Sequence, residues 1–497
     1  QKGCAGLAET TRGGDAAPAP VRVDEHNRTF QGDRAMRNRF VLIVFLLSFV
    51  FVATAVHAGE PETYKPTWES LAKHPTPEWF KDAKFGIFIH WGVYAVPGWA
   101  PEDRYAEWYP HRMYMKGTPT FKYHREHYGD QGEFGYKDFV PMFKAEKWDP
   151  DRWARLFRKA GARYVIPVAE HHDGFAMWDS DLTEWDAMDK GPHRDLIGEL
   201  AEAVRAEGMK FSASSHRARH WWYYPYDEDF DTADPRYSGL YCKPHGNTRR
   251  AWPNPKVDPP DEEFLDDWKA RWEEIRDKYK PDIMWFDGMW GLDPVFLEYD
   301  KEMMADYYNK AREWGKEVGI NNKGGKFRRK GLIPTEVGDW IEGDYMKQEK
   351  ISEVYWQNPR GIGHSYGYNR NEEPKDYNTT NDLVDELVDI VSKNGNMLLN
   401  VGPRGDGVIP EVQRDRLRGI GKWLEVNGEA IYRTRHWRTF GGGSIRYTQK
   451  GEKTLYAIAL EWPGKRVVLA DLKGTKPASV RMLGVPGELS WSMTEDG

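Results

Sequence analysis

Two adjacent histidines, His171 and His172, stand in the stretch AEHHDGFAMWDS (169–180), with Asp173 directly after them. The residues before them, GARYVIPV, are small or β-branched and predict a strand. Neighbouring side chains of a strand point to opposite faces, so both imidazoles can serve one site only if the strand ends there. Metal binding, hydrogen bonding to sugar hydroxyls and a plain structural role all fit this stretch on its own.

A carboxylate, Asp287, ends the apolar run of PDIMWFDGMWG, where Trp285, Phe286 and Trp290 flank it. A carboxylate at a strand end, walled by aromatic rings, is a candidate nucleophile. An aspartate that caps the turn before Gly288 fits the local sequence equally well.

A glycosidase needs a second carboxyl group, which keeps its proton until the leaving group takes it. Several acids follow Asp287 in the stretch EVGDWIEGDYMKQEKISEVYWQ, and most acids in such a loop are simply solvated. Composition does not choose among them: Asp339, Glu342, Asp344, Glu349 and Glu353.

Metal binding by the histidines lacks supporting motifs, because the sequence has no H-x-H, no H-E-x-x-H and no cysteine cluster. Hydrogen bonding to sugar hydroxyls, with Asp173 or the backbone fixing the imidazole tautomers, is therefore favoured, and no cofactor is expected. A metal-dependent hydrolase that uses His90, His171 and His172 is the rival hypothesis.

Strand-like and helix-like segments alternate along the chain, which favours a mostly parallel sheet. Strands are predicted at 84–94, 163–172, 210–216, 282–288, 320–323 and 396–403, and helices at 151–161, 195–209, 262–281, 302–319 and 382–395. The number of units favours a (β/α)₈-like barrel over 59–435, with its active site at the carboxyl ends of the strands. Six candidate residues fall at or near predicted strand ends: His90, His171, His172, Ser215, Asp287 and Asn321.

A different pattern begins after about residue 435, where TLYAIALEW, KRVVLADL, ASVRMLG and GELSWSM are short strand-like runs separated by turn residues. Residues 436–497 are therefore predicted to form a small antiparallel β domain, whose final strand is expected to be missing.

An export signal is predicted from Met36 to Ala58, because two arginines, an apolar run and small residues follow one another in MRNRFVLIVFLLSFVFVATAVHAGE. Residues 1–35 would then precede the true start, and an uncleaved membrane anchor is the alternative. Cys4 lies ahead of this segment and Cys242 is the other cysteine, so the mature chain can form no internal disulfide. A net charge of −7 without a basic tract argues against nucleic acid as a partner.

Seven ordered motifs carry a family resemblance: KFGIFIHWGVYAVP, YAEWYP, EHHDGFAMWDS, WFDG, SYGYNRNE, NMLLNVGPRGDG and KWLEVNGEAIY. From about residue 65 to 435 the chain resembles the α-L-fucosidases of glycoside hydrolase family 29. The resemblance implies a (β/α)₈-like barrel, a C-terminal β-sandwich, and retaining hydrolysis of α-L-fucosides in fucosylated glycans without a metal. It also implies that Asp287 is the nucleophile and that fucose is bound by His90, Glu107, Trp108, His171, His172 and Trp285.

Two stretches depart from the family pattern. Many members have Glu after the tryptophan of Trp356-Gln357, and in one branch that Glu is the acid/base. In the other branch the acid/base ends a GDY-x-T-P-E-like stretch, which GDYMKQE matches in part, so Glu349 is the predicted acid/base, with Glu353 and Glu342 as alternatives.

The second departure is SASSH, where fucosidases commonly have tyrosines beside the sugar and this chain has Ser214, Ser215 and His216. Together with Gln357, it keeps open the hypothesis of a carbohydrate-binding protein without catalysis.

Overall fold

A closed parallel barrel dominates the computed structural model, which describes residues 63–493 except 103, 245–258, 288–293, 324–333, 335–336, 471 and 473–474. Its strands are β1 (Phe85–Ile89), β2 (Tyr164–Glu170), β3 (Lys210–Phe211), β4 (Ala213–Ser215), β5 (Ile283–Phe286), β6 (Gly319–Lys323), β7 (Trp340–Glu342), β8 (Trp356–Gly361) and β9 (Gly395–Val401). All pair in parallel, and β1 pairs with both β2 and β9, which closes the sheet. Because β3 and β4 are two pieces of one strand, the barrel has eight strand positions and the predicted fold class is confirmed.

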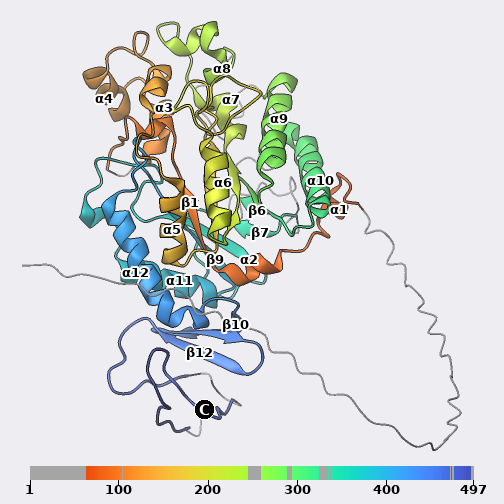
Figure 1. Ribbon diagram of the computed structural model, residues 1–497, viewed down its shortest axis with the longest axis vertical. Helices are drawn as coiled ribbons and strands as arrows, with labels where there is room; N and C mark the ends of the chain where they lie inside the picture. Colours follow the sequence, from red (N-terminus) through yellow and green to blue (C-terminus); the bar gives the residue numbers. More distant parts are fainter. Residues whose placement is uncertain are drawn as a thin grey trace, which may run out of the picture. The chain divides into compact units, whose positions relative to one another are not determined.

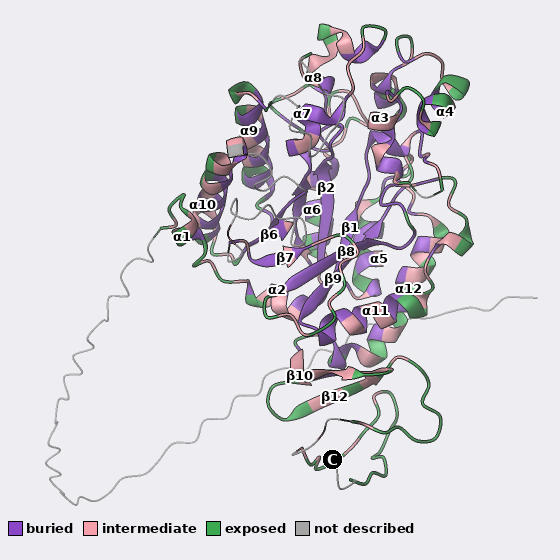
Figure 2. Cartoon of the chain, turned by 180° about the vertical axis from the view of Figure 1, so that it is seen from behind, coloured by how far each residue is buried: buried purple, intermediate pink, exposed green. Residues whose placement is uncertain are grey.

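Helices that follow the strands lie around the barrel, with the buried strands inside them (Figures 1 and 2). The long helices are α5 (Pro150–Ala160), α6 (Leu196–Ala206), α9 (Glu262–Tyr279), α10 (Leu297–Glu313), α11 (Thr380–Ser392) and α12 (Glu411–Asn427). The shorter ones are α1 (Trp68–Leu71), α2 (Glu78–Ala83), α3 (Tyr109–Arg112), α4 (Pro119–His127), α7 (His220–Tyr223) and α8 (Ser238–Tyr241).

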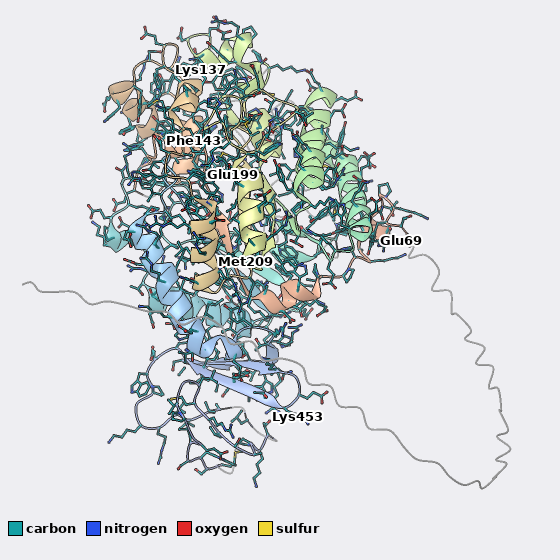
Figure 3. All side chains as sticks on the ribbon, viewed as in Figure 1. Glu69, Lys137, Phe143, Glu199, Met209 and Lys453 are labelled. Carbon is teal, nitrogen blue, oxygen red and sulfur yellow. The ribbon has the colours of Figure 1, made fainter. Side chains whose placement is uncertain are left out.

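Helix α5 shows how the sequence sets such an element. The Asp149 carboxylate accepts a hydrogen bond from the backbone N–H of Arg152, Pro150 occupies the first turn, and Gly161 ends the helix at a φ of 96°. Its buried face, which includes Trp153 and Phe157, packs toward the barrel. Figure 3 labels Glu199 of α6, whose carboxylate accepts a hydrogen bond from the indole of Trp148, just before α5.

The barrel departs from an ideal alternation at one described place, since residues 343–355 between β7 and β8 contain no helix. Neither of these two strands is among those that the sequence pattern predicts. The predicted helix 302–319 is shifted: it runs from Leu297 to Glu313 and ends two residues before Gly315, whose φ is 64°.

A small antiparallel sheet follows the barrel, formed by β10 (Arg435–Gly442), β11 (Ile445–Lys450) and β12 (Thr454–Ala459). It packs on α11, where the Arg446 guanidinium and the Asp389 carboxylate lie 2.6 Å apart. The C-terminal part therefore forms a single sheet and not the predicted sandwich, since the described residues of 460–493 contain no further strand. The apolar side chains of this segment, such as Val468 at 76% exposure, find no second sheet to pack against.

No helix in the described part of the chain is both long and apolar enough to cross a membrane. The predicted export signal, Met36 to Ala58, lies outside the described residues.

Candidate active site

A pocket of about 310 Å³ opens at the carboxyl ends of the barrel strands. Aromatic, basic and acidic side chains line it together: Phe88, His90, Tyr105, Glu107, Trp108, Arg112, His171, His172, His216, Arg219, Trp285, Asp287, Lys323, Asp344 and Tyr366. Seven of the eight residues proposed from the sequence as catalytic or fucose-binding are in this set; Glu349 is not.

Strand ends deliver the histidines and the aspartate to this pocket. His90 follows the last residue of β1, and Asp287 follows the last residue of β5. Strand β2 ends at Glu170, so the backbone is no longer extended through His171 and His172. Both imidazoles can therefore reach one pocket, which is the condition that the sequence imposed.

Asp287 is a buried carboxylate surrounded by cations and imidazoles. Its Oδ1 lies 2.5 Å from Lys323 Nζ, and its Oδ2 lies 3.3 Å from His172 Nε2 and 3.6 Å from Arg219 Nη1. Burial alone would raise the pKa of Asp287, but Lys323, Arg219 and the His172 hydrogen bond hold that pKa well below its ordinary value. The carboxylate is therefore ionised over the whole physiological range, as a nucleophile requires.

The neighbouring strand fixes the backbone beside Asp287. The Asn321 side chain on β6 accepts a hydrogen bond from Phe286 N–H (2.8 Å) and donates one to the Phe286 carbonyl (3.1 Å). Asp287 N–H itself donates to the carbonyl of Ser215 at the end of β4 (3.2 Å). Strand β5 is thus held from both sides at the point where it presents its carboxylate.

Hydrogen bonds also determine the tautomer of His90. Asn400 donates its side-chain N–H to the Tyr366 carbonyl (2.7 Å), so its Oδ1 faces His90 Nδ1 at 2.6 Å. His90 Nδ1 must then carry the hydrogen, and Nε2 carries the lone pair. Burial lowers the pKa of His90 to about 3, which makes the ring neutral at physiological pH.

The backbone orients His172, because its Nδ1 donates to the His216 carbonyl at 2.7 Å. Asp173 does not fix either tautomer as the sequence suggested. Its carboxylate accepts a hydrogen bond from the Tyr136 hydroxyl (2.6 Å), and its backbone carbonyl accepts one from the Tyr224 hydroxyl. Asp173 is thus engaged by the surrounding loops.

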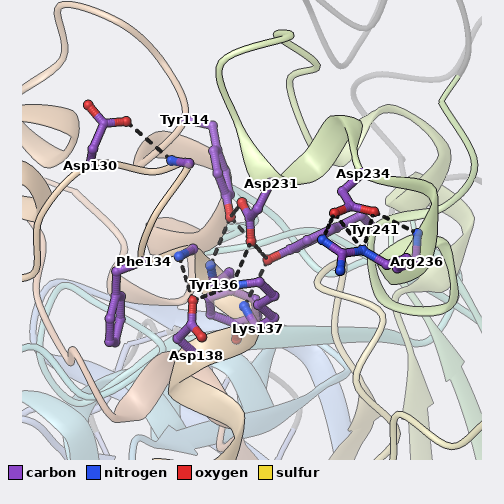
Figure 4. A network of polar contacts seen from close by, with 12 residues as sticks. Tyr114, Asp130, Phe134, Tyr136, Lys137, Asp138, Asp231, Asp234, Arg236 and Tyr241 are labelled. Carbon is purple, nitrogen blue, oxygen red and sulfur yellow. Dashed lines mark hydrogen bonds and ion pairs between the residues drawn. The ribbon is translucent and has the colours of Figure 1, made fainter.

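Those loops are joined by a buried network centred on Asp231 (Figure 4). Its carboxylate accepts hydrogen bonds from the hydroxyls of Tyr114 (2.7 Å) and Tyr241 (2.6 Å). The Tyr114 oxygen in turn accepts the backbone N–H of Tyr136. The network therefore connects the loop after β1 with the loop after β4, and Tyr136 carries it to Asp173 beside the histidine pair.

Glu107 and Trp108 come from a short 3₁₀ helix, Ala106–Trp108, and lie against the C-terminal part of the barrel. Glu107 Oε2 accepts a hydrogen bond from Gly367 N–H (2.8 Å). Burial raises the pKa of Glu107 to about 7, because it outweighs the N–H and hydroxyl donors and the charge of Arg112, which lower that pKa. The Trp108 ring lies 5.2 Å from the His172 ring and forms an apolar wall of the pocket.

Trp285 forms the pocket floor and is held from behind by Glu342. Its indole N–H donates to Glu342 Oε1 at 2.6 Å, and Lys323 Nζ lies 4.6 Å from the ring centre. Burial raises the pKa of Glu342 to about 8. Glu342 does not itself line the pocket, so it has no direct access to a bound sugar.

The other predicted acids lie elsewhere. Glu349 and Glu353 are exposed, and neither lines the pocket. Gln357, at the position where one family branch has its acid/base, is buried and donates to the Tyr164 hydroxyl at 2.6 Å. Tyr164 begins β2, so this contact lies at the amino end of the barrel strands, away from the pocket.

Three cationic residues of the pocket are absent from the sequence-based candidates: Arg112, Arg219 and Lys323. Lys323 ends β6, so the strand-end rule that selected His90 and Asp287 could have found it. Arg219 ends a 3₁₀ turn after β4 and Arg112 ends α3; no sequence signal marks either one. Lys323 Nζ bridges Asp287 and Asp344, which it meets at 3.0 Å.

Two groups of described side chains could hold a metal ion. One comprises His90, His171 and His216; the other comprises His172, His216 and Asp287. Within each group the possible ligand atoms all lie within 4.8 Å of one another.

Known proteins share both the sequence and the fold. A family model described as alpha-L-fucosidase matches residues 51–429, and one described as alpha-L-fucosidase C-terminal domain matches 441–497. Tissue alpha-L-fucosidase of Bos taurus is 34% identical over 469 residues, 92% of each chain, and that of Homo sapiens is 34% identical over 462 residues, 91% of each.

A solved structure of Thermotoga maritima alpha-fucosidase in complex with fucose superposes with a TM-score of 0.65 at 39% identity. It covers 79% of this chain and 85% of its own. With the matched models, the relatives and a barrel that presents Asp287 and the histidines in one pocket, the chain belongs to the α-L-fucosidase family of glycoside hydrolases.

Proposed function

We propose that this protein releases α-L-fucose from fucosylated glycans by a retaining double displacement in which Asp287 is the nucleophile. One observation carries the proposal: Asp287 is buried, is held ionised by Lys323 and Arg219, and faces the pocket together with four imidazoles. The relative solved with fucose supports the choice of sugar.

In the first displacement, Asp287 attacks the anomeric carbon while a general acid protonates the departing oxygen, giving a glycosyl-enzyme and the free alcohol. In the second, water attacks the same carbon, the conjugate base takes its proton, and the Asp287 carboxylate leaves. Neutral His90, His171 and His172 bind sugar hydroxyls, Glu107 offers a further polar group, and Trp108 and Trp285 pack against apolar parts of the sugar.

The test of the nucleophile uses an activated fluorinated fucoside, which forms the glycosyl-enzyme quickly and releases it slowly. Mass spectrometry of peptides should then find one fucosyl adduct, on Asp287. The first product of an ordinary fucoside, followed by NMR, should keep the α configuration. An adduct on another residue, or a β product, would contradict the proposal.

The acid/base of this mechanism has to be chosen among several acidic residues, whose positions relative to the pocket differ. Glu349 stays a prediction, but its exposed side chain is not brought to the pocket. Asp344 lines the pocket and is already engaged by Lys323. Between Lys323 and Val337 the sole acid of the sequence is Glu336, which lies outside the described residues.

Four single variants therefore test the role: Glu336→Ala, Asp344→Ala, Glu349→Ala and, as the buried comparison, Glu342→Ala. Loss of the general acid should slow hydrolysis of natural fucosides about 10²- to 10⁴-fold. A nitrophenyl fucoside, whose leaving group needs no proton, should lose far less in its first step. The variant that shows this dependence on the leaving group identifies the acid, and a uniform loss on both substrates excludes it.

Export is a separate part of the proposal and rests on the sequence from Met36 to Ala58. The mature chain should begin near Gly59 and face the periplasm or the exterior. N-terminal sequencing of protein from the native host tests this, and an intact Met36 in the membrane fraction would favour an uncleaved anchor.

A further inference from the structure

We infer that the imidazole trio formed by His90, His171 and His216 binds one borderline divalent cation of the zinc class, which then excludes the sugar. The three rings approach one another closely, with centres 5.8 Å (His90–His171), 5.4 Å (His90–His216) and 4.9 Å (His171–His216) apart. All three residues are buried, at 5% exposure or less, and all line the pocket.

Two ring nitrogens of the trio have no hydrogen-bond partner. Nδ1 of His171 and Nδ1 of His216 are both buried and make no hydrogen bond to the described residues; Asp287 Oδ2 lies 3.9 Å from His216 Nδ1. Buried polar atoms without a partner are uncommon and call for an explanation such as an ion. His90 adds a third nitrogen, since Asn400 takes its Nδ1 and leaves the lone pair on Nε2.

Neutral imidazole is the form that binds metal ions, and His90 offers Nε2 for this because its Nδ1 hydrogen is donated to Asn400. The alternative group, His172 with His216 and Asp287, is less suitable. Lys323 and Arg219 lie directly against the Asp287 carboxylate there and would repel an added cation; Lys323 also acts on His90 and His216, but its ion pairs are with Asp287 and Asp344. The trio is therefore the better site.

Zinc bonds to imidazole nitrogen are about 2.0–2.1 Å long, so tetrahedral ligands lie roughly 3.3 Å apart. The nitrogens of the trio lie within 4.8 Å of one another, and small ring rotations would bring them to that spacing. A fourth position would face the open pocket and take water. Hard cations such as Mg²⁺ prefer oxygen ligands and find no carboxylate in the trio.

His216 makes the trio possible, and it lies in the stretch SASSH, directly after β4. His90 and His171 are two of the residues proposed to bind fucose. Metal and sugar should therefore compete, a consequence that rests on the proposed function, whereas metal binding itself does not.

The experiment titrates Co²⁺ into the purified chain after EDTA treatment and dialysis, because tetrahedral cobalt has visible absorption. We expect one Co²⁺ per chain, displacement by Zn²⁺, and no effect of Mg²⁺. His216→Ala should weaken binding at least about tenfold, since even outer-shell partners of metal ligands are worth about 10- to 100-fold. His127→Ala, which removes an exposed imidazole on α4, is the matched control and should bind as the parent does.

Equal binding by the His216→Ala and parent proteins, or no cobalt spectrum at one equivalent, would overturn the site. His216→Asn, with circular dichroism, replaces His216→Ala should the latter not fold. Free L-fucose should release the Co²⁺, and Zn²⁺ should inhibit fucoside hydrolysis competitively. Stimulation by Zn²⁺ would overturn the inference in favour of a metal-dependent hydrolase, while a protein that binds metal but hydrolyses no fucoside would contradict the proposed function alone.

Discussion

Two walls of the pocket differ in charge although both are buried. The charged wall (Arg219, Asp287 and Lys323) comes from the ends of β4, β5 and β6, and the histidine wall (His90, His171 and His172) comes from β1 and β2. Burial opposes charge on both walls. On the charged wall, the cations 2.5 and 3.6 Å from the Asp287 carboxylate overcome the cost of burying its charge. On the histidine wall, the Asn400 amide and the His216 carbonyl accept hydrogen bonds from the rings but do not overcome the cost of a buried positive charge.

The difference teaches that burial sets the direction of a pKa shift unless charged partners together outweigh it, as they do at Asp287 and not at His90 or His172. One wall of the pocket can then hold a permanent anion for attack on the sugar, while the other offers neutral hydrogen-bonding groups to its hydroxyls.

The largest effect is expected from removing the anion of the charged wall. Asp287→Gly should reduce turnover of a nitrophenyl fucoside by about 10⁴- to 10⁶-fold, as loss of a group central to covalent catalysis does in proteases. Added azide can enter the vacated space and should restore part of the rate, with a β-fucosyl azide as product. Retention of more than a tenth of the parental rate would mean that the nucleophile is another group.

The next largest effect should come from the cation that keeps Asp287 ionised. In Lys323→Met, one of the cations that lower the pKa of Asp287 is lost, while burial still raises that pKa. The pKa of Asp287 should therefore rise, and the acidic limb of kcat/KM should move to higher pH. Each unit of that rise costs about tenfold in ionised carboxylate below the pKa, so the loss should be largest at pH 5. Lys453→Met, in the exposed turn between β11 and β12 (Figure 3), is the control. An unmoved acidic limb would show that Lys323 does not set this charge.

A smaller effect is expected on the histidine wall. His171→Asn should lower kcat/KM by roughly 2- to 10-fold, the worth of one neutral hydrogen bond. Because burial keeps the His171 ring neutral, the pH profile should keep its shape, in contrast to Lys323→Met. If the kcat/KM profile of the parent has a limb near pH 6 and the profile of His171→Asn lacks it, His171 titrates and the expectation is wrong.

The last effect is on stability rather than on rate and concerns Glu107, which is buried like Asp287 but where burial outweighs the charge of Arg112. Its pKa rises from 4.5 to about 7, so between these values the folded protein holds a proton that the unfolded chain releases. Stability should therefore fall as pH rises from about 4.5 to 7, with the loss complete above that window. Glu107→Gln should flatten this slope in urea unfolding at pH 5 and pH 8, and exposed Glu126→Gln should leave it unchanged.

Much of the barrel could be predicted from the sequence, because strand segments such as GIFI and YVIPVA carry no charged residue and the helices between the strands have clear start and stop residues. Strand β8 escaped prediction, since WQNPRG is polar and contains Pro359. It is buried because its neighbours β7 and β9 pair with it and the barrel interior accepts Gln357 as a partner for Tyr164.

Site residues at strand ends could be predicted, because the closed barrel brings all such ends together. Residues on the connecting loops could not, since the sequence does not say which way a loop folds. Asp344 lines the pocket and Glu349, five residues later, does not, yet both look alike as acids in one polar stretch.

The Asn321 side chain has one consequence for the chemical ageing of the enzyme. Its amide acts as a substitute peptide group, with the oxygen on Phe286 N–H and the nitrogen on the Phe286 carbonyl. Deamidation would turn that nitrogen into an oxygen that cannot donate, leave the carbonyl without its partner, and place a negative charge one residue from Asp287. Loss of a single ammonia molecule would thus loosen the strand end that aims the nucleophile, without altering any group that touches the sugar.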